Sequence, residues 1–145
     1  MDRKMHRRAI PLILAGITAS TFLGGCNREV TDDSVTRVSV SEVHRRLDRV
    51  GRGIELLDAR DRASYERSHI PGARHVTLPD IDPTRPTPSL EGRGTLIVYG
   101  EHPGSATALA IAKRLWRTMD RVEFMEQGFS AWVDRGLPTT GTDSR

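Results

Sequence analysis

Apolar residues along this chain fall into short runs, and the segments between several of them have helical spacing. Five runs predict strands, at residues 38–40, 54–57, 73–76, 95–99 and 122–125. Helical segments are predicted at residues 62–67, 105–117 and 129–135, and where Val43, Leu47 and Val50 mark one apolar face. Strands that alternate with helices predict an α/β fold. We expect a central, mostly parallel five-stranded sheet with helices on both faces.

Local signals refine the ends of these elements. Ser39 and Glu42 have the spacing of a capping box at the start of the first helix. Four prolines make residues 79–94 a loop. Gly136 is expected at the C′ position of the last helix. The buried side of the 105–117 helix is expected to consist of Leu109, Ala112, Leu115 and Trp116.

The first 25 residues have the pattern of an export signal, with a basic head, an apolar run and small residues before Cys26. The apolar run is about 14 residues long, which is shorter than a membrane-spanning helix. The sequence Leu23-Gly24-Gly25-Cys26 resembles the lipobox of bacterial lipoproteins. That resemblance implies that Cys26 is diacylated and becomes the first residue after cleavage. The alternative is an ordinary signal peptide followed by a cysteine that carries no lipid.

Four regions follow from this interpretation: a signal peptide at 1–25, a lipidated Cys26 with a flexible tether at 26–37, a domain at 38–139 and a polar tail at 140–145. The protein is expected to be exported and held by lipid on a membrane, facing the periplasm or the cell exterior. Asn27 stands where an aspartate favours retention in the inner membrane, so the outer membrane is preferred if the organism has one.

The net charge of +3 comes from the predicted signal peptide, residues 1–25. Four of the 22 basic residues and one of the 19 acidic residues lie in the first 25 positions, so the rest of the chain holds 18 of each sign. A neutral domain gives no reason to expect nucleic acid as a partner. With one cysteine and no metal-ligand spacing among the histidines, neither a metal site nor a cofactor is expected.

Three stretches resemble the rhodanese-like family. One runs from Leu57-Asp58-Ala59-Arg60 through Tyr65 to His69-Ile70-Pro71-Gly72-Ala73, and a second covers Gly128 to Pro138 with Trp132 at its centre. The third is the strand 97–99, which stands before the loop where the family places its active site. The resemblance covers residues 38–138. It implies the rhodanese-like fold and a relationship to sulfurtransferases.

The motif residues also have structural interpretations. Asp58 follows a buried strand, and we expect both Asp58 and Arg60 to be mainly structural. His69 is expected to be a hydrogen-bonded structural histidine, and Gly72 is expected in a tight turn. Trp132 is expected to be a core anchor.

The family's catalytic cysteine has no counterpart in this chain, because the corresponding position is Gly100 and the following loop holds no cysteine. Sulfur transfer through this loop requires a thiolate, so we expect no catalytic residue here. The preferred function is therefore a catalytically inactive binding or accessory module in the cell envelope, with a protein partner. Its candidate anion-binding or partner-binding loop comprises Gly100, Glu101, His102, Pro103, Gly104 and Ser105.

Two enzymatic alternatives remain open. A sulfurtransferase could use a thiol that its own loop does not contain, for example one supplied by a partner. A hydrolase could use Ser105 as nucleophile with His102 as base, although Ser105 also suits a helix N-cap.

Overall fold

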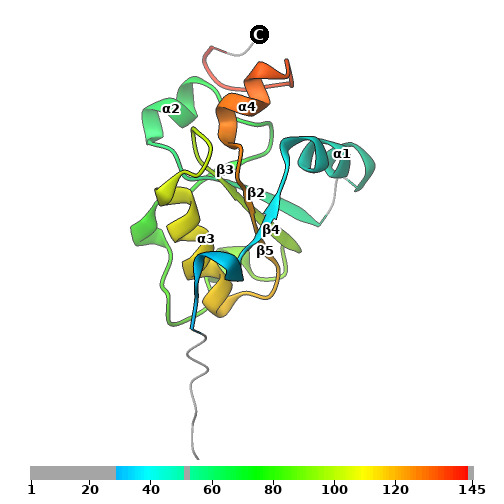
Figure 1. Cartoon of the computed structure of the whole chain (residues 1–145). Coiled ribbons are helices and arrows are strands. Elements are labelled where there is room, and N and C mark those ends of the chain that lie inside the picture. The colour runs from blue at the N-terminus through cyan, green and yellow to red at the C-terminus, as the bar shows by residue number, and fades with distance from the viewer. Residues whose placement is uncertain (1–28, 51–52, 144–145) are drawn as a thin grey trace, which may run out of the picture.

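The computed structural model describes residues 29–50 and 53–143, and it is built around one parallel sheet (Figure 1). Its strands are β1 (Thr36–Val38), β2 (Ile54–Asp58), β3 (Arg74–His75), β4 (Thr95–Tyr99) and β5 (Val122–Met125). They are ordered β1-β5-β4-β2-β3, and every pair is parallel. The predicted α/β fold with a five-stranded sheet is confirmed. Cys26, the signal peptide and the start of the tether lie outside the described residues.

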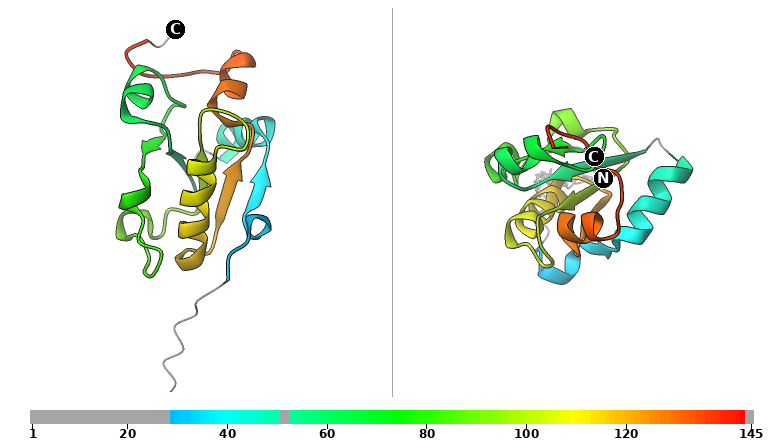
Figure 2. Two further views of the ribbon diagram at one scale, coloured as in Figure 1. Left: turned by 60° about the vertical axis from the view of Figure 1, so that its left-hand side comes forward. Right: turned by 90° about the horizontal axis from the view of Figure 1, so that it is seen from above.

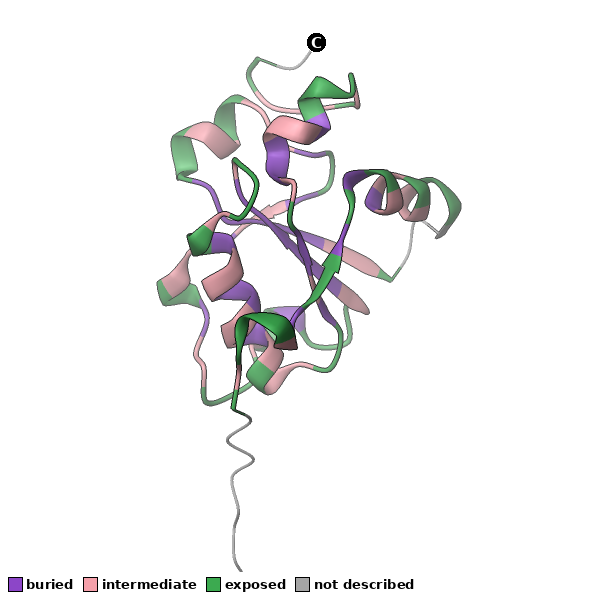
Figure 3. Ribbon diagram, in the orientation of Figure 1, coloured by how far each residue is buried: buried purple, intermediate pink, exposed green. Residues whose placement is uncertain are grey.

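Helices cover both faces of the sheet, as predicted (Figure 2). They are α1 (Val40–Val50), α2 (Arg62–Arg67), α3 (Ala106–Thr118) and α4 (Gly128–Asp134). Alternate strand residues contribute to two cores: Leu57, Val98 and Phe124 pack on the α3 side, and Leu56, Ile97 and Met125 on the α1 and α4 side. The central strands are therefore buried on both faces (Figure 3), which explains their nearly continuous apolar runs.

The first strand lies two residues earlier than the predicted range of 38–40. Ser39 is better placed as a cap, because its Oγ accepts a hydrogen bond from the amide of Glu42 at 3.2 Å, and α1 begins at Val40. The Glu42 carboxylate pairs with Arg46 at 2.7 Å. Val38 and Val40 flank Ser39, and this apolar-polar-apolar alternation is typical of a strand.

Part of the predicted tether belongs to the folded domain. A short 3-10 helix, η1 (Asp32–Ser34), precedes β1, and Val35 between them is only 2% exposed. The Lys113 side chain of α3 forms an ion pair with Asp32 at 2.7 Å. Ordered structure therefore begins upstream of residue 38. Among the described residues, no helix combines the length and apolar composition that crossing a bilayer requires.

The buried face of α3 is shifted from the predicted one. Its fully buried residues are Ala108, Ile111, Ala112 and Leu115, which form one helical stripe. Leu109 and Trp116 are half-buried and pack against the same core. Because Trp116 is large and apolar, the predicted buried face was centred too close to it.

The remaining boundaries are close to those predicted. β3 has two residues instead of the four predicted over 73–76. The proline-rich loop contains two short 3-10 helices, η2 (Leu78–Asp80) and η3 (Pro88–Leu90). Gly136 follows α4 with a φ of 67°, as expected for its C′ position. Pairing of Asp58 with Tyr99 brings the carboxyl ends of β2 and β4 side by side, and this edge carries the candidate site.

Candidate functional site

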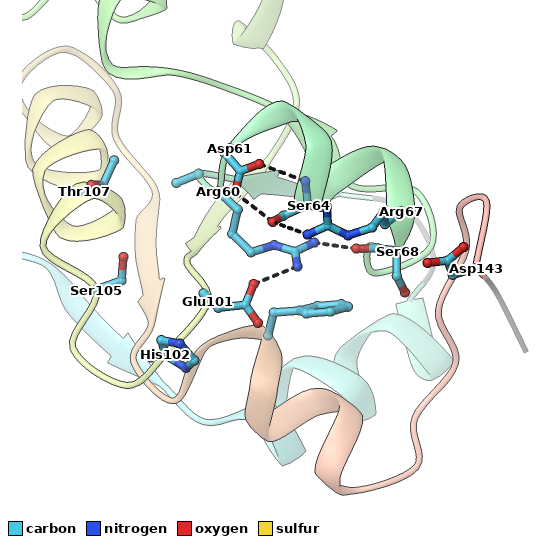
Figure 4. A pocket seen from close by; sticks show the side chains of 12 residues that line it. Arg60, Asp61, Ser64, Arg67, Ser68, Glu101, His102, Ser105, Thr107 and Asp143 are labelled. Carbon is cyan, nitrogen blue, oxygen red and sulfur yellow. Dashed lines mark hydrogen bonds and ion pairs between the residues drawn. The ribbon is translucent and has the colours of Figure 1, made fainter.

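A cavity of about 620 Å³ lies at the carboxyl ends of β2 and β4 (Figure 4). Its lining comes from the β2–α2 segment, the loop after β4, the first turns of α3 and α4, and the C-terminal segment. The lining residues are Ala59, Arg60, Asp61, Ser64, Arg67, Ser68, Glu101, His102, Ser105, Thr107, Phe129 and Asp143. Crevices at this edge are where parallel α/β sheets usually bind ligands.

Asp58 and Arg60 form a buried ion pair beneath the cavity. The Arg60 Nη2 lies 2.8 Å from Asp58 Oδ2, and its Nε lies 3.1 Å from both carboxylate oxygens. Asp58 Oδ1 also accepts the Arg60 backbone N–H at 2.9 Å. Asp58 is fully buried, and the Arg60 side chain is 4% exposed. The expected structural role of this pair fits the geometry.

A second carboxylate reaches Arg60 from the loop after β4. Glu101 Oε2 accepts a hydrogen bond from Arg60 Nη1 at 2.9 Å. Arg60 Nη2 also donates to the carbonyl of Ser68, and its guanidinium lies 3.8 Å from the centroid of the Phe129 ring. Burial disfavours the charged form, but hydrogen bonds to Asp58 and Glu101 outweigh it and raise the pKa of Arg60. Arg60 therefore stays charged.

The Arg60–Glu101 contact was not predicted, because it depends on the register of β2 against β4. Asp58 is paired with Tyr99 in the sheet, so Arg60 and Glu101 each stand two residues beyond neighbouring strand ends. Ser64 on the other side of Arg60 hydrogen bonds to Asp61. In this chain the loop supplies the acidic partner of Arg60.

The loop after β4 is hydrogen bonded to the start of α4. The carbonyls of Gly100 and Glu101 accept the amides of Phe129 at 2.8 Å and Ser130 at 2.9 Å. The Gly104 amide donates to the Glu126 carbonyl at 2.9 Å. The segment 126–130 therefore holds the loop both at its start and near its tip.

Gly128 permits this close packing. Its φ is 72°, and a Cβ at this position would lie 2.7 Å from the Glu101 carbonyl oxygen. A larger residue would have to separate the loop from α4.

Ser105 fills the space beside Gly100. A Cβ built on Gly100 would overlap both Oγ and Cβ of Ser105 and would lie 3.2 Å from Cβ of Ala108. Ser105 is the N-cap of α3, and its Oγ accepts the Ala108 amide at 3.5 Å. Gly100 therefore lacks a side chain, and the space beside it has no room for one.

Ser105 and His102 both line the cavity, but the structure does not pair them. His102 is exposed, and its ring does not point toward the Ser105 hydroxyl (Figure 4). Within residues 53–143, no hydrogen bond joins the two side chains. Pro103 and Gly104 are exposed at the tip of the loop, outside the cavity lining.

The other motif residues support the fold outside the cavity lining. His69 Nδ1 lies 2.7 Å from the carbonyl oxygen of Tyr65, and the two rings stack with centroids 4.0 Å apart. Gly72 has a φ of 80° in the turn closed by the Ala73 amide and the Ile70 carbonyl at 3.0 Å. The buried Trp132 donates its indole N–H to the Pro138 carbonyl at 2.8 Å.

Two supporting side chains were missed by sequence reasoning. Tyr99 is completely buried, and its hydroxyl oxygen accepts the Ile70 amide at 3.3 Å. Burial and the nearby Asp58 carboxylate raise the pKa of Tyr99, so the phenol stays neutral. Gln127 Oε1 accepts the Val40 amide at 2.9 Å and so joins α1 to the start of α4. No local pattern in the sequence signals either contact.

No group of three or more potential metal ligands occurs in the part of the chain that the structure describes.

Comparisons with known proteins agree with this architecture. The family model for the rhodanese-like domain matches residues 39–135. The solution NMR structure of a rhodanese-like domain from Anabaena sp. is 29% identical, with a TM-score of 0.62 over 75% of this chain and 82% of that chain. A Bacillus halodurans protein of 19% identity has a TM-score of 0.66, over 77% of this chain and 81% of that one, and shows the shared fold alone.

A thiosulfate sulfurtransferase from Pseudomonas aeruginosa is also similar, with 25% identity and a TM-score of 0.58. The match covers 76% of this chain and 20% of that protein, so it relates one part of the larger enzyme to this chain. Since the family model spans more than half of the sequence and solved relatives share the sheet and helices described above, the chain belongs to the rhodanese-like domain family.

Proposed function

We propose that this protein is a lipid-anchored, rhodanese-like binding module of the cell envelope with no sulfur-transfer activity of its own. The observation that carries the proposal is the relationship between Gly100 and Ser105. The nucleophile position has no side chain, and the space beside it is filled. Sulfane transfer needs a sulfur that can hold a second sulfur, and the chain's only cysteine is Cys26, which acylation would consume.

The cavity supports a binding role, because it is open, polar and structurally fixed. Arg60 is held by Asp58 and Glu101, and the loop after β4 is hydrogen bonded to α4. Such a site needs little rearrangement to receive a ligand or a side chain of a protein partner.

The position of the described N-terminus supports presentation of this cavity away from a membrane. The described chain begins at Glu29, at the opposite end of the domain from α2, α4 and the cavity (Figures 1 and 2). Only Asn27 and Arg28 lie between Cys26 and Glu29, so a fully extended link of three Cα-to-Cα steps is about 10 Å long. A lipid on Cys26 would hold the domain close to the bilayer with the cavity facing the aqueous side.

Activity assays test the absence of catalysis. The purified full-length protein should show no thiosulfate-to-cyanide sulfur transfer, and clear turnover would refute the binding role as stated. Turnover that requires an added thiol protein would instead support the sulfurtransferase alternative. Fluorophosphonate labelling of Ser105 would support a hydrolase.

Lipid attachment is tested with a radiolabelled fatty acid in the native cells. The wild-type protein should incorporate the label and should appear in the membrane fraction. The Cys26→Ala variant should neither incorporate the label nor appear in that fraction. Separation of inner from outer membranes tests the expected outer-membrane location. Cross-linking of the lipidated protein in its envelope identifies the partner.

A further inference from the structure

The two carboxylates that bind Arg60 are held very differently. Asp58 is fully buried and contacts both Nε and Nη2 of Arg60. The Glu101 side chain is 42% exposed and contacts only Nη1, at 2.9 Å. Figure 4 shows Glu101 reaching the guanidinium from the opposite side of the cavity to Ser64 and Asp61. Nη1 is thus the Arg60 atom whose hydrogen-bond partner, the Glu101 carboxylate, can be replaced by another acceptor.

We propose that Glu101 occupies a carboxylate-binding site, and that a carboxylate of the ligand displaces it and pairs with Nη1 of Arg60. The inference rests on the proposed binding function and names its ligand chemistry. The Arg60–Glu101 ion pair is then an autoinhibitory contact, which an incoming carboxylate must break.

The Glu101 side chain can leave without disturbing the loop. Its backbone carbonyl is fixed by the Ser130 amide at 2.9 Å, so rotation of the side chain alone removes the carboxylate. The released carboxylate regains full hydration, because it is already partly exposed. Arg60 keeps its bonds to Asp58 and to the Ser68 carbonyl, and the Phe129 ring still supports its guanidinium. The binding atom is therefore preorganised in both states.

The charges around the cavity favour a single negative charge on the ligand. The charged side chains in its lining are Arg60, Arg67, Asp61, Glu101 and Asp143. A monovalent carboxylate replaces Glu101 with no change in charge next to Arg60. A dianion such as sulfate adds a second negative charge near Asp61 and Asp143, without a further buried cation to balance it.

The neighbouring groups are already committed to internal contacts. Asp61 caps α2 by accepting the amide of Ser64 at 2.9 Å and its hydroxyl at 2.7 Å. Arg67 donates to Ser64 Oγ at 3.0 Å. Arg60 Nη1 is therefore the buried cationic donor of the cavity lining, whereas Arg67 is exposed.

The test compares acetate binding by the full-length protein and by Glu101→Ala, both in detergent at constant ionic strength. The NMR signal of Arg60 Nε–H reports occupancy, since Nε belongs to the same guanidinium. Glu101→Ala should bind acetate about tenfold more tightly than wild type, which is the size of one charged hydrogen bond. Sulfate should show no comparable gain.

Glu66→Ala is the matched control. Glu66 is an exposed acidic residue of α2 whose carboxylate pairs with Arg62 rather than with Arg60. Its removal takes the same charge from the same end of the molecule without freeing Nη1. An equal gain in Glu66→Ala would overturn the proposal, because general electrostatics would then explain the effect. Unchanged acetate affinity in Glu101→Ala would also overturn it.

Two further arms sharpen the result. Glu101→Gln keeps a neutral acceptor for Arg60 and should show a smaller gain than Glu101→Ala, and it serves as the test variant if the alanine protein does not fold. A short peptide with a free C-terminal carboxylate should bind Glu101→Ala better than its C-terminal amide. Equal binding of acid and amide peptides would exclude a chain terminus as the source and leave small carboxylates. These outcomes do not depend on the sulfur-transfer assay, so failure here and failure of the proposed function are separable.

Discussion

The Ser105 side chain occupies the space into which a side chain on Gly100 would project. Introducing a cysteine by Gly100→Cys should therefore destabilise the domain by about 1–3 kcal/mol through overpacking. The variant should form no persulfide with thiosulfate, because the Gly104 and Ser105 amides remain bonded to the Glu126 and His102 carbonyls. Urea denaturation measures the first effect, and mass spectrometry measures the second.

A double variant separates the steric effect of a side chain at position 100 from the loss of a site that can load sulfur. Ser105→Gly removes the overlapping atoms and, as an N-cap change, should cost only a few tenths of a kcal/mol, roughly. Gly100→Cys combined with Ser105→Gly should recover most of the lost stability and still fail to load sulfur. Cys26→Ser in every variant leaves residue 100 as the only thiol. Efficient persulfide formation by either variant would show that the loop retains a functional anion cradle.

The two carboxylates that pair with Arg60, those of Asp58 and Glu101, should contribute very different amounts to the free energy of unfolding. Asp58→Asn removes the fully buried partner and leaves a buried cation under-compensated, which typically costs about 3–5 kcal/mol. Glu101→Gln removes a half-exposed partner and should cost at most about 1 kcal/mol. Urea denaturation of both variants measures the difference. Equal losses would mean that Glu101 is as much a part of the core network as Asp58.

The alternation of apolar runs predicted the fold well because the central strands β2, β4 and β5 are short, largely apolar and bounded by clear loop or helix signals. The run 95–99 became β4 with the predicted limits, and 122–125 became β5. The start of the domain was less accurate. Ser39 between two valines satisfies both a strand pattern and an N-cap, and the sequence alone does not decide between them.

The site was harder to predict because its contacts join segments far apart in the chain. The glycine at position 100 is the sequence feature on which the expectation of a missing nucleophile rests. That Ser105 fills the space beside Gly100 could be seen only once the path of the loop was known. Arg60 could have been matched with Glu101 only from the register of β2 against β4. Likewise, nothing in the polar tail signals that its backbone pairs with α2 and His69.

That C-terminal segment should stabilise α2. Thr140 exchanges two backbone hydrogen bonds with His69, and the amides of Thr142 and Asp143 donate to the Glu66 and Arg67 carbonyls at 3.0 and 2.9 Å. The segment runs beside α2 in Figure 1 and supplies partners for carbonyls at the end of that helix. Deletion of residues 140–145 should therefore destabilise the domain by about 1–3 kcal/mol, at about 1 kcal/mol or less for each bond.

Deletion of residues 144–145 alone is the matched control, since it preserves all four of these bonds. Hydrogen exchange gives a local measure. The Ser68 amide, which donates to the Ser64 carbonyl at 3.1 Å, should exchange faster in the longer deletion than in the shorter one. If both deletions protect this amide equally, the tail does not hold α2.

Two caps should make the domain sensitive to acid. The pKa of Asp61 is lowered mainly by the hydrogen bond from the Ser64 side chain and then by the Ser64 amide. The pKa of Asp80 is lowered in the same way by Thr77. A carboxylate with a lowered pKa in the folded state stabilises that state above its ordinary pKa, near 3.9. That contribution should be lost as the pH falls below about 4 and through the folded pKa values, which NMR titration of each carboxyl carbon measures.

Each cap serves as the control for the other. Ser64→Ala removes the main donor to Asp61, so the pKa of Asp61 should rise toward its ordinary value while that of Asp80 stays low. Thr77→Val should do the reverse, because the Thr77 hydroxyl donates to Asp80 Oδ2 at 2.6 Å. A parallel rise of both pKa values in either variant would point to general unfolding in acid. Independent rises would assign the acid sensitivity to the two caps, because each hydroxyl reaches only its own carboxylate.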